Sequence, residues 1–194
     1  MFQSAVTRTT DWLVQGGSIS EADREVYEFG LDKLFSMLSN FIFTAALGLL
    51  FGMFAQTVVF YATYIMLRVY AGGYHAEKPL RCFFISIGAI IPCLLAVRFQ
   101  QMWNVSVLFY SLLGLCVIVL VILGPTGNKN KMPDELERKV YGRRLLRNLA
   151  ITILAAVTLS LLSLPSFASA VLCGILLAAI MAVIGKGKLL LQSQ

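Results

Sequence analysis

The sequence predicts an all-α integral membrane protein that forms a single unit over residues 1–194. Of its 194 residues, 58% are hydrophobic and only 13% are charged, with a mean hydropathy of +0.80. A soluble domain is roughly a quarter charged, so this composition excludes a disordered chain and argues strongly against a soluble one. The uncharged runs are apolar on every face, which favours membrane helices over the alternating strands of a barrel.

The spacing of the charges predicts about six transmembrane helices. Four runs carry no charge, with 34 residues after Lys33, 16 after Arg81, 30 after Arg98 and 38 after Arg147. About 20 residues cross a bilayer, so the longest two runs suit two spans each. The expected spans are 36–54, 57–71, 80–98, 104–123, 148–163 and 166–185. We place the breaks within these two runs at Ala55-Gln56-Thr57 and Ser163-Leu164-Pro165-Ser166. For the first run, one span followed by a re-entrant segment is an alternative to two spans.

A polar, amphipathic N-terminal region, residues 1–35, precedes the bundle at 36–185. It has no apolar core of the kind that a cleavable signal peptide requires. Between Ser20 and Phe35, apolar and acidic residues alternate with helical spacing. We expect a helix capped by Ser20 that lies along the membrane surface and leads into the first span. Packing of this helix against the protein itself is an equal alternative.

The basic residues predict the orientation. With six spans and both termini cytoplasmic, 15 of the 16 Lys and Arg residues lie on the inner side, and only Arg98 does not. Anionic membrane lipids therefore account for the net charge of +6, and no nucleic-acid partner is expected.

One of the four cysteines differs from the others in its surroundings. Cys93, Cys116 and Cys173 lie within apolar runs, where we interpret them as small buried side chains. Cys82 follows a polar stretch that contains His75, the only histidine in the chain. An imidazole can take the proton of a thiol, and the amino end of a helix favours the resulting thiolate.

The spacing requires the backbone to bend between His75 and Cys82. Seven residues of continuous helix would separate them by about 10 Å along the axis, too far for direct proton transfer. Gly72-Gly73 permits a tight turn, and Pro79 disfavours helix at the residue before it. A polar interface histidine near a small helix-end cysteine is the other reading that the spacing allows. These residues make no convincing metal set, and no cofactor is expected.

The residues Arg68-Val69-Tyr70-Ala71-Gly72-Gly73-Tyr74-His75-Ala76, followed by Cys82 and Ser86, closely resemble the signature of the accessory gene regulator B (AgrB) family. Its members are membrane cysteine endopeptidases of quorum sensing. The resemblance covers the whole chain in layout and includes a basic loop around Lys129 and Lys131. The acidic run Asp134-Glu135-Leu136-Glu137 has no counterpart that we can assign.

The resemblance implies a catalytic dyad of His75 and Cys82. The substrate would be an AgrD-like signal propeptide, whose C-terminal tail leaves as an acyl-thioester forms on Cys82. A substrate thiol or hydroxyl could then close a thiolactone or lactone ring. Backbone amides around Arg81 and Cys82 are candidate oxyanion donors. The candidate substrate-binding or supporting residues are Arg68, Gly72, Gly73, Glu77, Arg81, Ser86, Lys129 and Lys131.

Two other functions remain open, a small membrane peptide transporter and a non-catalytic membrane assembly protein. The spans contain no buried charge that could couple transport. Gly48 and Gly52 form a G-x-x-x-G pattern, which is weak support for a homodimer.

Overall fold

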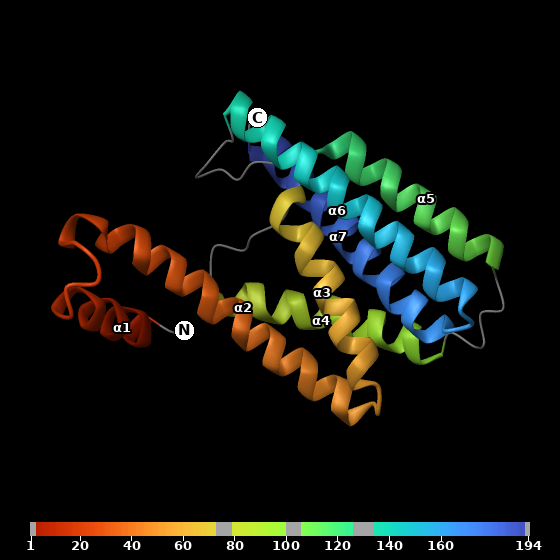
Figure 1. The fold of residues 1–194 in the computed structure, drawn as a ribbon, viewed down its shortest axis with the longest axis horizontal. Coiled ribbons are helices and arrows are strands. Elements are labelled where there is room, and N and C mark those ends of the chain that lie inside the picture. Colours follow the sequence, from red (N-terminus) through yellow and green to blue (C-terminus); the bar gives the residue numbers. More distant parts are fainter. Residues whose placement is uncertain (1–2, 73–78, 100–105, 126–133, 193–194) are drawn as a thin grey trace.

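The computed structural model describes residues 3–72, 79–99, 106–125 and 134–192. Within these ranges the chain forms helices and connecting turns and no strand element, which confirms the all-α class (Figure 1). The helices, in chain order, are α1 (Gln3–Gln15), η1 (Glu21–Asp23, a 3-10 turn), α2 (Arg24–Leu50), α3 (Phe54–Ala71), α4 (Pro79–Arg98), α5 (Ser106–Leu123), α6 (Glu135–Leu161) and α7 (Pro165–Gln192).

Helices α2–α7 overlap the six expected spans. Three helical segments within the described ranges are long and apolar enough to cross a membrane, namely Glu21–Leu50, Glu135–Leu161 and Pro165–Leu191. Phe84–Arg98 and Leu108–Leu123 are shorter apolar helices. The break before α7 lies where the sequence predicts it, because Pro165 opens that helix.

The expected break in the first uncharged run is wrong. Gln56 and Thr57 lie inside α3, and the chain turns earlier, at Phe51–Met53. Gly52 has φ +68°, a conformation that glycine adopts without a Cβ clash. Thr57 does not interrupt the helix, because its hydroxyl donates to the carbonyl of Met53 at 2.9 Å. The run therefore folds as two packed helices.

The N-terminal region agrees with the expectation in part. The expected helix leads directly into the first span, since α2 continues from Arg24 to Leu50, about 40 Å. The expected cap is wrong, because Asp23 precedes α2, and Ser20 precedes the 3-10 turn without a side-chain capping hydrogen bond. The additional helix α1 packs against the start of α2 (Figure 1). Arg24 joins the two, because its guanidinium lies 2.7 Å from Asp11 of α1. The same guanidinium lies 2.5 Å from Glu21 in the η1 turn between them.

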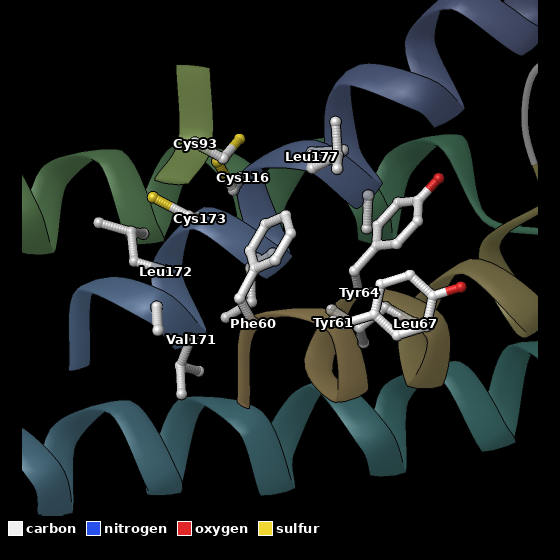
Figure 2. Packing of buried hydrophobic residues seen from close by; sticks show 14 of the residues in the cluster. Phe60, Tyr61, Tyr64, Leu67, Cys93, Cys116, Val171, Leu172, Cys173 and Leu177 are labelled. Carbon is white, nitrogen blue, oxygen red and sulfur yellow. The ribbon is translucent and has the colours of Figure 1, made fainter. Parts of the chain in front are cut away.

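Helix α7 is the centre of the bundle and packs against α3, α4, α5 and α6 (Figure 1). Small residues recur every four positions along its buried side, at Ala170, Gly174, Ala178 and Ala182. Membrane helices associate through such stripes because their backbones can approach closely. A Cβ at Gly174 would lie 2.8 Å from the Cβ of Thr63 on α3. The core around this contact contains Phe60, Leu67 and Val171 (Figure 2).

Gly48 of the G-x-x-x-G pattern has a comparable role between α2 and α3. A Cβ there would lie 2.5 Å from the hydroxyl oxygen of Thr57. Gly52 is part of the turn rather than of the helix. The pattern is therefore used for packing within one chain, and it gives no support for a homodimer.

Candidate active site

The first part of the candidate site is the end of α3. Gly72 follows the helix with φ +72° and ψ −147°, a region of backbone conformation restricted almost entirely to glycine. Its N–H still donates to the carbonyl of Arg68 at 3.2 Å. The half-buried Arg68 guanidinium in turn donates to the carbonyl of Gly72. Arg68 and Gly72 therefore fix the direction in which the chain leaves α3.

Helix α6 holds this end of α3 in place. The buried amide of Asn148 donates to the carbonyl of Met66 at 3.0 Å. The ring of Tyr70 lies 6.2 Å from that of Tyr141, and the guanidinium of Arg144 lies 5.9 Å from the Tyr70 centroid. Such a cation–π contact stabilises by about 0.5–1 kcal/mol at an exposed site. The sequence analysis assigned no role to Asn148. A polar amide at the start of an apolar run does, however, indicate a residue that faces other helices rather than lipid.

The second part of the site is the start of α4, which begins at Pro79 as the sequence predicts. Proline suits this position because the first helical N–H has no intrahelical acceptor. Cys82 is the fourth residue of the helix, and for residues 79–83 only the helical backbone is described. Ser86 follows one turn later and is half-buried.

Several predicted site residues lie outside the described residues. They are Gly73, His75, Glu77, Lys129 and Lys131. The pairing of His75 with Cys82, and a contact of Arg68 with Glu77, therefore remain predictions.

The acidic run Asp134–Glu137 has a structural explanation. Asp134 is the N-cap of α6, and its N–H donates to the Glu137 carboxylate at 3.4 Å. Glu135 and Glu137 lie in the first turn, where the helix dipole favours negative charge. The run starts the helix that carries the exposed basic residues Arg138, Lys139, Arg143, Arg144 and Arg147.

The remaining three cysteines are buried, as the sequence predicts. Cys93 from α4, Cys116 from α5 and Cys173 from α7 gather on one side of the core (Figure 2). They lie among apolar side chains and contribute to the contacts between these helices. In the part of the chain that the structure describes, no three His, Cys, Asp or Glu side chains are placed to hold a metal ion.

The ends of the helices alternate between two sides of the bundle. The beginnings of α2, α4 and α6 lie toward the left and upper left of Figure 1, with the ends of α3 and α7. Arg68, Cys82 and the basic turns of α6 therefore belong to helix ends on the same side. Arg98 ends α4 toward the opposite side (Figure 1).

Comparisons with known proteins find relatives of this chain by sequence. The chain is 29% identical over 154 residues to the accessory gene regulator protein B of Staphylococcus haemolyticus, covering 78% of this chain and 77% of that protein. It is 26% identical over 181 residues to the protein FsrB of Enterococcus faecalis, covering 88% and 71%. A putative AgrB-like protein of Listeria monocytogenes is 25% identical over 128 residues, covering 64% and 62%. No solved structure matches the chain.

The family model described as accessory gene regulator B matches residues 6–184. This match includes both parts of the candidate site, all of α2–α6 and α7 as far as residue 184. The chain therefore belongs to the accessory gene regulator B family.

Proposed function

We propose that this protein is a membrane-embedded cysteine endopeptidase that removes the C-terminal tail of a quorum-sensing propeptide. Membership of the accessory gene regulator B family implies a part in quorum-sensing peptide processing. The finer assignment, with Cys82 as nucleophile and His75 as base, rests on the residues Arg68–Ser86.

The observation that carries the proposal is the position of Cys82 in the first turns of a new helix. Helix α3 ends at Ala71, and α4 begins at Pro79. The chain therefore leaves one helix before His75 and enters the next before Cys82, as proton transfer between the two side chains requires. The partial positive charge at the start of α4 stabilises a thiolate at position 82.

Helix α4 has a buried side and an exposed side. Ile90, Cys93 and Val97 are buried on one side, whereas Phe84 and Ile85 on the other side are exposed. Ser86 lies one turn before Ile90 and is half-buried, so this candidate supporting residue lies beside the buried side of the helix.

In the proposed reaction, His75 takes the thiol proton and the Cys82 sulfur attacks the peptide carbonyl between signal and tail. Of the amides expected as oxyanion donors around Arg81 and Cys82, that of Arg81 lies in the first turn of α4 together with that of Leu80. N–H groups in this turn have no intrahelical acceptor and can donate to the oxyanion. When the C–N bond breaks, His75 returns the proton to the departing amine. The signal region then remains as a thioester on Cys82.

A substrate thiol can resolve this thioester by forming a thiolactone, with Cys82 regaining a proton through His75. Exclusion of water from the bundle would favour this exchange over hydrolysis. We place the site on the cytoplasmic side of the cell membrane, because the basic residues concentrate at the same helix ends. Lys129 and Lys131, with the basic turns of α6, are positioned in sequence to attract an acidic tail.

The test is co-expression of the full chain with an AgrD-like precursor, followed by mass spectrometry. We expect a shortened precursor and a covalent peptide on Cys82. Cys82→Ala and His75→Ala should abolish cleavage. Cys116→Ala, a buried cysteine outside the site, should retain it.

Cleavage that persists in Cys82→Ala membranes at the wild-type rate would overturn the enzyme assignment. Uptake or release of uncut peptide by the same membranes would instead support the transporter alternative. Equal amounts of each variant in the membrane, measured by immunoblot, ensure that loss of cleavage is not loss of protein.

A further inference from the structure

An apolar groove runs between α2 and α3, outside the candidate active site. It has a volume of about 340 Å³ and is lined by Met37, Leu38, Phe41, Tyr61, Ala62, Ile65 and Met66. Helix α2 is the least buried of the three long apolar helices, and Met37 and Leu38 are both exposed. In a membrane the groove therefore opens to the surrounding lipid.

The side chains that line the groove leave no polar group that an occupant would have to hydrogen-bond. Its single polar side chain is Tyr61, whose hydroxyl already donates to the carbonyl of Met37 at 3.0 Å. An extended peptide in the groove would leave its own N–H and C=O groups unpaired, at a cost of several kcal/mol each in lipid. A hydrocarbon chain has no such groups.

The volume also argues against a helix as occupant. One turn of α-helix with its side chains is about 10–12 Å wide and 5.4 Å tall, which is roughly 500 Å³. The groove is smaller than one turn, so a second copy or a partner helix could insert only a side chain. An extended acyl chain is narrow enough to lie within it.

A cation precedes the groove on α2. Lys33 is the last charged residue before the 34-residue uncharged run and is exposed. It precedes Met37 by four residues, so both lie on one face of α2, about 6 Å apart along the axis. Its ammonium is 5.3 Å from the Phe29 ring centroid, and no ion pair of Lys33 occurs among the described residues.

We propose that this groove holds one acyl chain of a phospholipid whose anionic headgroup is bound at Lys33. Moving a hydrocarbon tail from bulk lipid into an apolar groove gains little hydrophobic free energy, because both surroundings are apolar. The shape of the groove therefore determines that an acyl chain binds there, and Lys33 determines that the headgroup is anionic. This site does not depend on the proposed protease activity.

Native mass spectrometry of the detergent-purified full chain tests the proposal. The protein is incubated with phosphatidylglycerol or with phosphatidylcholine of the same chains. We expect one tightly retained phospholipid, with phosphatidylglycerol preferred. Lys33→Gln should reduce that preference about fivefold, the ratio that corresponds to ~1 kcal/mol for one lysine near an anionic surface.

Two matched tryptophan variants distinguish the groove from the general lipid-facing surface. Ala62→Trp places an indole in the groove, whereas Ala46→Trp adds the same side chain to an exposed position on α2 outside the lining. We expect Ala62→Trp to lose the retained lipid and Ala46→Trp to keep it. Equal retention by both variants, or an adduct with the mass of a second chain instead of a lipid, would overturn the proposal.

Discussion

Substitution of Gly174 by alanine tests how the bundle is held together. A Cβ at this position would lie 2.8 Å from the Cβ of Thr63 and 2.9 Å from the carbonyl oxygen of Phe60. Both neighbours are close to or part of the α3 backbone, so neither can rotate away. One added methyl group must therefore push α3 and α7 apart.

The size of the effect follows from two opposing contributions. Overpacking of a dense interior costs about 1–3 kcal/mol. Replacing a mid-helix glycine by alanine returns about 0.5–1 kcal/mol, because the unfolded chain loses less entropy. A Cβ at Gly187, on the same helix, would meet no atom within 4 Å, so Gly187→Ala receives only the second contribution. The two variants should therefore differ by about 1–3 kcal/mol.

Thermal unfolding of both variants in the same detergent measures this difference. In a chain of this size each kcal/mol shifts Tm by roughly 2–4 °C. We expect Gly174→Ala to unfold several degrees below Gly187→Ala, with wild type between them. Equal Tm values for the two variants would refute the reasoning, because they would show that α3 and α7 are not in contact at Gly174.

Three further substitutions give distinct outcomes. Gly72→Ala places a residue with a Cβ in a backbone conformation that only glycine adopts readily, which costs about 1–3 kcal/mol. We expect slower precursor cleavage, and an unchanged cleavage rate would count against a role for this turn. Asn148→Leu removes the hydrogen bond to Met66, and unfolding in detergent should show a loss of about 0.5–1.5 kcal/mol; unchanged stability would mean that this bond does not hold α3. Asn40→Leu removes a buried side-chain oxygen that has no hydrogen-bond partner among the described residues, while the Ser36 carbonyl to which its amide donates still accepts from the Ser39 hydroxyl, so Tm should rise; a lower Tm would show that another molecule satisfies this oxygen in the membrane.

The helical boundaries show how far charge spacing and proline can predict this fold. The ends of α3, α4 and α5 agree with the expected spans at Ala71, Arg98 and Leu123, because charges or glycines follow the apolar runs. The expected break at residues 55–57 is wrong, because it relies on side-chain polarity alone. Hydroxyl groups inside a membrane helix can donate to the preceding turn, so Thr57 is compatible with a helix and Gly52 marks the turn.

The candidate site could be predicted only where it depends on local backbone properties. The glycine exit at Gly72 and the proline start at Pro79 are local backbone properties, and the structure has both. The contacts of Asn148 and Arg144 with α3 join residues that are far apart in the chain, 82 positions in the case of Asn148 and Met66. No local pattern specifies such a pair, because it depends on how α6 packs beside α3.

The amino-acid sequence by itself determined that the chain is a helical membrane protein, where most of its helices end, and which short stretch contains the candidate nucleophile. These properties depend on composition and on local backbone preference. Only the tertiary structure decided that α7 is central, that Gly48 packs within the chain, and that α2 and α3 leave a groove open to lipid. Those properties depend on the distance between helices, which is set by the small side chains where two helices meet, and sequence spacing alone does not reveal which helices meet.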